Sequence, residues 1–317
     1  MKIKNFFTVI TVVILFSFFS LDAEAVGIFR GEGTKENPYL IETKEDLFTL
    51  AEQVNAGNRY ENLWFRQSAD IDLEEEVWCP IGICNSDNYF YGIYDGAGHT
   101  ITNLKIEDNE YGALFGTLGG VVVNLGIDNA VIKAPVAAGI SCYAAKNSAT
   151  IINCYSKADV TGETVGGISV DFYGRIYNCW SDCIIEGEAE GGITVYEPLE
   201  IYNCYSRQIP VLYTNRLIPN VMQVSQEELY SQDSCNALNA ELYTRNIGDQ
   251  IGYQDYVYWN LDEQLLQFGM QEPTRYEWVK QNKVKCLMLL FLVCIGTYFT
   301  YQLMLMKKRG DRNAIFK

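Results

Sequence analysis

The strongest constraint on how this chain can fold is a motif that recurs every 25 residues. Its three copies are Asn153-Cys154-Tyr155-Ser156, Asn178-Cys179-Trp180-Ser181 and Asn203-Cys204-Tyr205-Ser206. A fixed period of about 20 to 50 residues is typical of a solenoid, in which each repeat buries its apolar edge by stacking on its neighbours. Short runs of Ile, Val, Tyr and Cys between Gly and Asn predict strands and turns. We therefore predict an all-β fold, a parallel β-helix with about three short strands per turn.

The asparagine of each repeat is expected at a bend. Ile151 and Cys154 are both apolar, yet residues three apart in an unbroken strand point to opposite faces. A left-handed residue between them resets the alternation, and Asn adopts that region more readily than other non-glycine residues. We therefore expect an amide ladder beside a stack of core cysteines. These structural repeat positions are Asn153, Asn178, Asn203, Cys154, Cys179 and Cys204.

If the cysteines face inward, the aromatic residue after each one faces outward. Tyr155, Trp180 and Tyr205 would then form an exposed aromatic column with strands about 4.7–4.9 Å apart. Such a column could stack on sugars or take a protein partner, which makes these three the candidate ligand-binding residues. The alternative is that local loops cover the rings. Two positions further on, the charges of Lys157, Asp182 and Arg207 alternate, which favours this register.

The two ends of the chain predict export and anchoring. Residues 1–25 resemble a signal peptide, with Lys2 and Lys4 before an apolar run and a small-x-small cleavage site at its end; an uncleaved anchor is the alternative. Residues 284–306 are assigned as a transmembrane helix because the run from Cys286 to Met306 is apolar, uncharged and long enough to span a bilayer. The basic tail 307–317 is expected in the cytoplasm. The chain is therefore predicted to be a single-pass membrane protein with its bulk extracellular.

Three further segments fill the region between these ends. Residues 26–60 are predicted to form an N-terminal cap with an amphipathic helix that begins after Thr43 and buries Leu47, Leu50, Ala51 and Val54. Residues 61–213 carry the β-helix rungs. Residues 214–283 are expected to form a C-terminal helical cap, starting with a capping box at Ser225, followed by a stalk.

The net charge limits the kinds of molecule that the chain can bind, and the cysteine content bears on the redox environment in which it folds. Residues 26–283 carry 16 Lys and Arg against 37 Asp and Glu, a formal net charge of −21, which repels nucleic acid. Ten cysteines in an exported protein favour disulfides. For the cysteine stack, a reduced ladder and a bridge between adjacent rungs both remain open. Cys79 and Cys84 could close a small loop.

The order of motifs resembles a known family. It runs Gly-x-Gly-Thr, Asn-Pro-Tyr-Leu-Ile, an amphipathic helix, Asp-Ile-Asp-Leu, Trp-x-Pro-Ile-Gly, Tyr-Asp-Gly-x-Gly-His-Thr-Ile, Leu-Phe-Gly and the Asn-Cys rungs. This order, over roughly residues 31–210, resembles bacterial surface proteins that carry GLUG repeats. It also resembles the repeat-bearing N-terminal region of IgA-cleaving metallopeptidases. The resemblance implies a right-handed parallel β-helix at the cell surface that serves as a scaffold or adhesin-like module.

Candidates for catalysis or metal binding are few. A hydrolase needs two nearby carboxylates, for which Asp70, Asp72 and Asp95 are candidates, but the favoured interpretation is that Asp95-Gly96 is a turn and that Asp70 and Asp72 cap strand ends. The single histidine, His99, could be a general base or a structural residue. No His-Glu-x-x-His motif exists, and although acidic clusters make calcium a candidate ion, none has the spacing of a known loop. We therefore expect no cofactor.

The sequence as a whole predicts a membrane-anchored extracellular β-helix that acts without catalysis in surface recognition, adhesion or scaffolding. Its expected partners are a glycan or a surface protein. The alternative is a carbohydrate-active enzyme of β-helix type, a polysaccharide hydrolase or lyase working at the cell surface.

Overall fold

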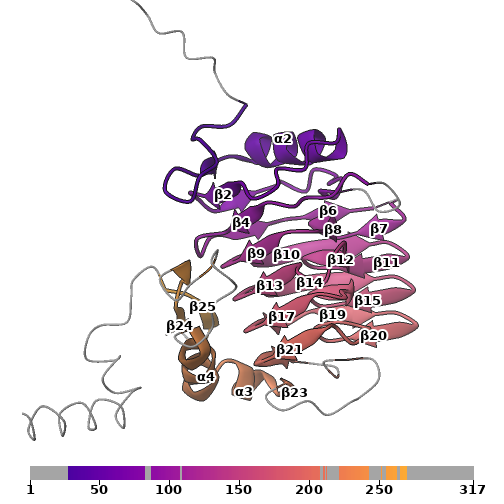
Figure 1. Ribbon diagram of the computed structural model, residues 1–317. Coiled ribbons are helices and arrows are strands. Elements are labelled where there is room, and N and C mark those ends of the chain that lie inside the picture. The colour runs from indigo at the N-terminus through magenta and orange to yellow at the C-terminus, as the bar shows by residue number, and fades with distance from the viewer. Residues whose placement is uncertain are drawn as a thin grey trace, which may run out of the picture.

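The computed structural model describes residues 28–82, 87–107, 109–207, 210, 212, 221–242, 251, 255–262 and 265–269. The predicted signal peptide, transmembrane helix and basic tail lie outside these residues. The described part is mostly β-structure and forms a parallel β-solenoid with few helices (Figure 1). It has about six turns, because one side of the coil is a stack of seven strands and each step from one strand to the next is one turn.

Parallel pairing in register builds the first sheet. Its strands, in order, are β1 (Tyr39–Ile41), β2 (Trp64–Gln67), β4 (Ile93–Asp95), β9 (Val121–Val123), β13 (Thr150–Ile152), β17 (Arg175–Tyr177) and β21 (Glu200–Tyr202). Ile151, Ile176 and Ile201 are direct neighbours across β13, β17 and β21, as the 25-residue period predicts. The coil before them is longer, since Val121 pairs with Thr150. The upstream repeats therefore look looser in the sequence.

Three further sheets close the coil. The second contains β3 (Ile71–Asp72), β5 (Thr100–Thr102), β10 (Gly126–Lys133), β14 (Tyr155–Thr161), β18 (Trp180–Ser181), β22 (Cys204–Ser206) and β23 (Val221–Gln223), with β6 (Lys105–Ile106) and β19 (Ile184–Glu186) beside this path. The third contains β7 (Tyr111–Gly112), β11 (Val136–Ala138), β15 (Thr164–Gly166) and β20 (Ala189–Gly191). The fourth contains β8 (Phe115–Leu118), β12 (Ser141–Ala144) and β16 (Ser169–Asp171).

The asparagine bend predicted from the sequence is confirmed. Asn153, Asn178 and Asn203 have φ values of 55°, 54° and 51°, in the left-handed region. Ile151 and Cys154, on either side of the bend, both lie in the interior core cluster. The left-handed residue therefore lets two apolar side chains three positions apart enter the same core. Asn103 and Asn124 adopt the same conformation in earlier coils.

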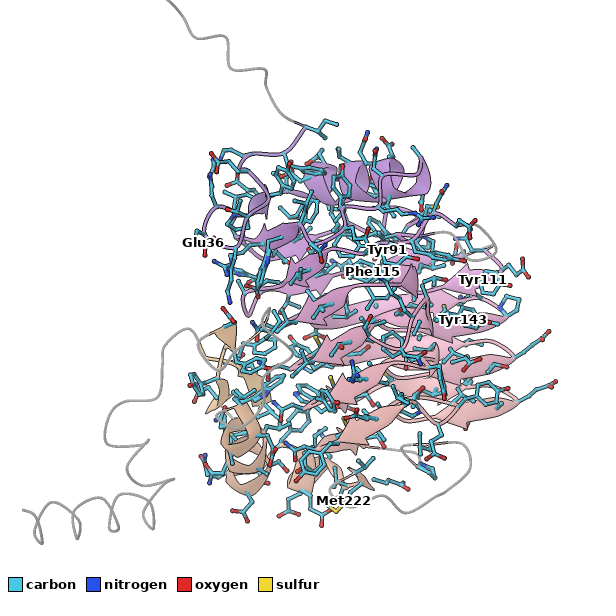
Figure 2. The ribbon with its side chains drawn as sticks, in the orientation of Figure 1. Glu36, Tyr91, Tyr111, Phe115, Tyr143 and Met222 are labelled. Atoms are coloured by element: carbon cyan, nitrogen blue, oxygen red, sulfur yellow. The ribbon has the colours of Figure 1, made fainter. Side chains whose placement is uncertain are left out.

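The aligned glycines mark a second, tighter bend. A Cβ atom on Gly166 would lie 1.7 Å from the Ser169 carbonyl oxygen, and one on Gly191 would lie 2.0 Å from that of Thr194. No side chain fits at such a distance, so glycine is required where the third sheet folds back to the fourth. Close to this fold, the rings of Tyr111 and Tyr143 lie 5.7 Å apart at the solenoid's edge, while Phe115 is buried inside (Figure 2).

The predicted N-terminal helix is present as α2 (Lys44–Asn55). Thr43 is its N-cap and forms a capping box with Asp46. The four residues of the predicted stripe are buried and belong to the interior core cluster, together with Trp78 and Phe90. The helix lies across the N-terminal end of the solenoid (Figure 1). Its apolar face thus packs on side chains of the first coils.

The C-terminal segment differs from the prediction. Ser225 does form a capping box at α3 (Gln226–Leu229), which is followed by α4 (Gln232–Leu242) and an antiparallel pair, β24 (Trp259–Asp262) and β25 (Leu265–Phe268). In Figure 1, β24 and β25 lie beside the solenoid next to the ends of β9 and β13, α4 lies below this pair, and α3 lies beside β23 at the C-terminal end. A helical cap over the last coil is therefore not confirmed. Leu229, Leu238 and Leu266 pack in a cluster with Tyr155, Trp180 and Tyr205 on the outer face of the coil, which removes their apolar surface from water.

None of the helices within the described residues is both long enough and apolar enough to cross a membrane. The predicted span at 284–306 falls outside those residues.

Candidate functional site

A continuous ladder of side-chain amides runs along one corner of the solenoid. Asn124 Nδ2 donates to Asp95 Oδ1 at 3.0 Å, and Asn153 Nδ2 donates to Asn124 Oδ1 at 2.7 Å. Asn178 Nδ2 donates to Asn153 Oδ1 at 2.8 Å, and Asn203 Nδ2 donates to Asn178 Oδ1 at 2.6 Å. Each amide has two N–H groups and uses one of them along the ladder. The geometry agrees with the amide ladder expected from the repeat.

The aromatic column lies directly beside this ladder. Tyr155, Trp180 and Tyr205 are in register on β14, β18 and β22, but their exposed fractions are 5%, 0% and 5%. The expectation that these rings are exposed is therefore wrong. The rings of Tyr155 and Trp180 also stack on each other, with centroids 4.6 Å apart and planes 4° from parallel. Their facing surfaces are thus unavailable for stacking on a sugar. We call the ladder and these three rings the flank column.

The cover over the flank column comes from far along the chain. The Trp259 ring lies 6.1 Å from Tyr155 and 6.0 Å from Trp180. Phe268 lies 5.7 Å from Tyr155, and Tyr230 lies 5.9 Å from Trp180. The covering residues all belong to the C-terminal segment, which we call the clasp, meaning the described residues from 226 to 269. The rings of Tyr155 and Trp180 are therefore covered by a distant segment instead of local loops.

The clasp is also bound through its backbone. Asn124 Nδ2 donates to the Asp255 carbonyl at 2.7 Å, and Asn124 Oδ1 accepts from the Val257 N–H at 3.1 Å. Asn153 Nδ2 donates to the Val257 carbonyl at 2.8 Å. Further along, Asn203 Nδ2 donates to the Ala237 carbonyl at 3.3 Å. Each of these amides therefore donates a further hydrogen bond to a backbone carbonyl of the clasp.

Within the clasp, Asn239 continues this pattern. Its side chain donates to the Trp259 carbonyl at 2.9 Å and accepts from the Trp259 N–H at 2.7 Å. Alternate residues 255, 257 and 259 are thus held by side-chain amides, as in a strand whose neighbour is replaced by Asn side chains. An ion pair between Lys35 and Asp255, 2.8 Å long, ties the same stretch to the N-terminal region.

Burial controls the protonation of this region. It raises the pKa of Tyr155 to about 12 and that of Tyr205 to about 12. Burial also raises the pKa of the Cys179 and Cys204 thiols well above the ordinary value of 9.0. These groups therefore stay neutral near neutral pH and act as packing and hydrogen-bonding groups.

The charged row next to the column is paired within the solenoid. Lys157 contacts Asp128 at 3.2 Å, and Arg207 forms an ion pair with Asp182. Asp182 also accepts a hydrogen bond of 2.5 Å from the Tyr230 hydroxyl of the clasp. The alternating charges expected from the sequence thus begin one coil earlier, at Asp128.

The carboxylates considered for catalysis are engaged in local structure. Asp95 is buried, binds Arg66 Nε at 2.9 Å and accepts the Ala97 N–H in a turn. Asp70 accepts the Thr100 N–H at 2.9 Å and lies 3.2 Å from His99 Nδ1.

Asp72 accepts from Asn103 at 2.7 Å and from the Glu74 N–H at 2.8 Å. These two hydrogen bonds lower the pKa of Asp72, whereas a glycosidase general acid needs a raised pKa.

Among the described cysteines, Cys79, Cys154, Cys179, Cys183 and Cys204 are free thiols. Cys154 donates to the Ile152 carbonyl and Cys179 to that of Tyr177, at 3.2 and 3.1 Å. Cys84, the suggested partner of Cys79, lies outside the described residues. Within the part of the chain that the structure describes, no three His, Cys, Asp or Glu side chains are grouped so as to hold a metal ion.

Comparisons with known proteins found two partial sequence relatives and one solved structure with a similar fold. No protein-family model matches the chain. An alignment of length 156 with halomucin of Haloquadratum walsbyi is 33% identical and covers 44% of this chain and 2% of halomucin. An alignment of length 107 with a provisionally named Gly-rich membrane protein of Evansella cellulosilytica is 39% identical and covers 31% of this chain and 12% of that protein. The chain thus spans only a small part of either relative.

A crystal structure shares the fold. It is that of a protein from Bacteroides ovatus provisionally named an immunoglobulin A1 protease. The match covers 78% of this chain and 97% of that one, with a TM-score of 0.53 and 20% sequence identity. At this identity the likeness concerns the fold alone. It agrees with the resemblance to the repeat-bearing region of IgA-cleaving metallopeptidases.

The sequence reasoning missed the residues that cover the column. Asp255, Val257, Trp259 and Asn239 were assigned to a cap or stalk, because the 25-residue period fades after residue 207. One signal was present in the stretch Tyr256-Val257-Tyr258-Trp259, whose β-branched and aromatic residues are typical of a strand. A strand so far from the repeats needs a docking surface, and the aromatic column is the surface it uses.

Proposed function

We propose that this chain is a membrane-anchored extracellular solenoid that serves as a non-catalytic scaffold or recognition module. The observation that carries this proposal is the engagement of its candidate catalytic carboxylates. Asp95 is buried against Arg66 and Asn124, and the hydrogen bonds to Asp72 favour its ionised form. Such groups stabilise bends between coils and do not resemble an acid and base pair facing a substrate.

Surface location is supported by three independent features. The first is the sequence pattern of an apolar run followed by Lys307, Lys308 and Arg309. The second is the strongly acidic region 26–283, which suits solubility outside a cell. The third is the names of the two relatives, a mucin-like name and a membrane-protein name. The resemblance to GLUG-repeat surface proteins points to the same location.

The test is protease protection on intact bacterial cells that express the full chain with an epitope after residue 317. External protease should digest the solenoid region, leave the C-terminal epitope intact, and leave that epitope in the membrane fraction after an alkaline wash. Recovery of the whole chain in the soluble fraction would refute the anchor. Incubation of the full chain with a glycan array, followed by mass spectrometry of the glycans, tests catalysis; any cleaved product would refute the non-catalytic role and favour the carbohydrate-active enzyme.

A further inference from the structure

The clasp and the solenoid have separate apolar cores. The interior cluster of the solenoid contains no described residue beyond Val221. The clasp residues Leu229, Leu238 and Leu266 belong instead to the outer cluster, together with Tyr155 and Trp180. Removing the clasp would therefore expose the flank column without opening the interior core. A unit whose contacts are confined to one outer face can dissociate as a unit.

The contacts that hold the clasp resemble peptide recognition. Asn124 and Asn153 bind the carbonyl groups of residues 255 and 257 and the N–H of residue 257. These atoms are common to any extended peptide, as in domains that add a strand to a sheet edge. One side chain, Trp259, supplies the bulky anchor against Tyr155 and Trp180. The flank column thus recognises an extended strand that carries an aromatic residue.

The fit between clasp and column leaves polar groups unsatisfied. The indole Nε1 atoms of Trp180 and Trp259 are both buried and have no hydrogen-bond partner among the described residues. A buried donor without an acceptor opposes the packing that holds it. The closed arrangement is therefore weaker than its apolar contacts alone would make it, which lowers the free energy needed to detach the clasp.

The point at which the clasp could swing out is also defined. β23 pairs with β22 and continues the solenoid, and Val224 still donates to the Ser206 carbonyl. Ser225 then caps α3, the first element of the clasp. A change of backbone direction at these two residues moves the clasp and leaves the solenoid pairing intact.

We propose that the flank column is a peptide-docking site whose partner is the clasp of a second copy of this chain, so that two copies pair by exchanging clasps. Every copy carries a segment that fits the column, and the same contacts form within a chain or between chains. The proposal extends the scaffold role proposed above but needs no membrane location, so the two can fail separately. Because each copy is strongly acidic, pairing should strengthen as salt screens the repulsion.

The experiment mixes two variants of the detergent-solubilised full chain, each with a different affinity tag. Trp180→Ala has a defective column and a normal clasp, whereas Trp259→Ala has a normal column and a defective clasp. Each variant alone should dimerise at least about tenfold more weakly than wild type, since buried tryptophans dominate such interfaces. The mixture regenerates one native interface per pair and should recover mixed dimers on a two-tag pull-down.

Two controls make the result decisive. Val257→Pro removes the N–H that Asn124 accepts and should weaken pairing, whereas Val257→Ala keeps it and should not. Slow reaction of the buried Cys154, Cys179 and Cys204 thiols with a thiol reagent reports an intact solenoid in every variant. Monomeric wild-type protein at all concentrations, or no mixed dimers from variants with protected thiols, would overturn the proposal.

Discussion

Replacing Asn178 by alanine tests whether the amide ladder stabilises the solenoid. Asn178 is 2% exposed, with φ of 54°, and lies in the middle of the ladder. The substitution removes its bond to Asn153 Oδ1 and the one it accepts from Asn203 Nδ2. Two net hydrogen bonds account for about 2 kcal/mol. Holding an alanine in the left-handed region costs about 1 kcal/mol more.

The expected loss of unfolding free energy is therefore about 3 kcal/mol. With a urea dependence of about 3 kcal/mol per molar for a domain of this size, the midpoint of unfolding should fall by about 1 M. Asn178→Gly keeps the left-handed conformation and loses only the bonds, so its midpoint should fall by about 0.7 M. Both are measured by tryptophan fluorescence of the full chain in detergent.

Asn129→Ala is the matched control, because Asn129 has φ of 51° but is exposed and lies outside the ladder, where it makes a single solvent-exposed side-chain hydrogen bond to Asn103 Oδ1. Its midpoint should fall by less than half as much as that of Asn178→Ala. Equal midpoints for wild type and Asn178→Ala would refute the argument that the ladder is a stabilising element. Equal losses at Asn129 and Asn178 would show that backbone conformation, and not the ladder, carries the effect.

Three further outcomes follow from the structure. Burial raises the pKa of Cys179, and that of Tyr155 to about 12, so above about pH 9 the folded state retains protons that the unfolded chain loses. The free energy of unfolding should therefore be constant below about pH 9 and fall above it. A urea midpoint that stays flat up to pH 11 would contradict this. Asp95→Ala should lower the unfolding free energy by about 2–3 kcal/mol, because it leaves Arg66 and Asn124 without their shared acceptor. The control Asp159→Ala, on the exposed surface, should change it by less than about 0.5 kcal/mol. Leu47→Ala, at a fully buried position of α2, should cost about 2–5 kcal/mol in the same urea assay, and no loss relative to the exposed control Glu52→Ala would show that α2 is not part of the core.

Prediction from sequence was most accurate where only one local conformation is compatible with the pattern of residues. The Asn bends could be predicted because Ile151 and Cys154 cannot share a core without a left-handed residue between them. The helix α2 could be placed because Thr43 and Asp46 mark its start and four apolar residues mark one face. The in-register pairing of Ile151, Ile176 and Ile201 followed from the constant period.

The candidate site was predicted only in part. The alternation of residues correctly placed Tyr155, Trp180 and Tyr205 on the outside of the coil. It could not show what packs against that outside, because alternation describes a strand relative to its own sheet. The cover depends on pairs such as Asn153 with Val257, which are 104 residues apart in the chain.

The repeat by itself determined the coil, its register and the inward and outward sides of each strand, because these depend on contacts between neighbouring repeats. Only the tertiary structure decided that the outward aromatic column is a buried interface. That outcome arises because a non-repeating segment, the clasp, packs its apolar side chains on the flank and accepts hydrogen bonds from the ladder amides there. A period in the sequence contains no information about a partner that does not share it.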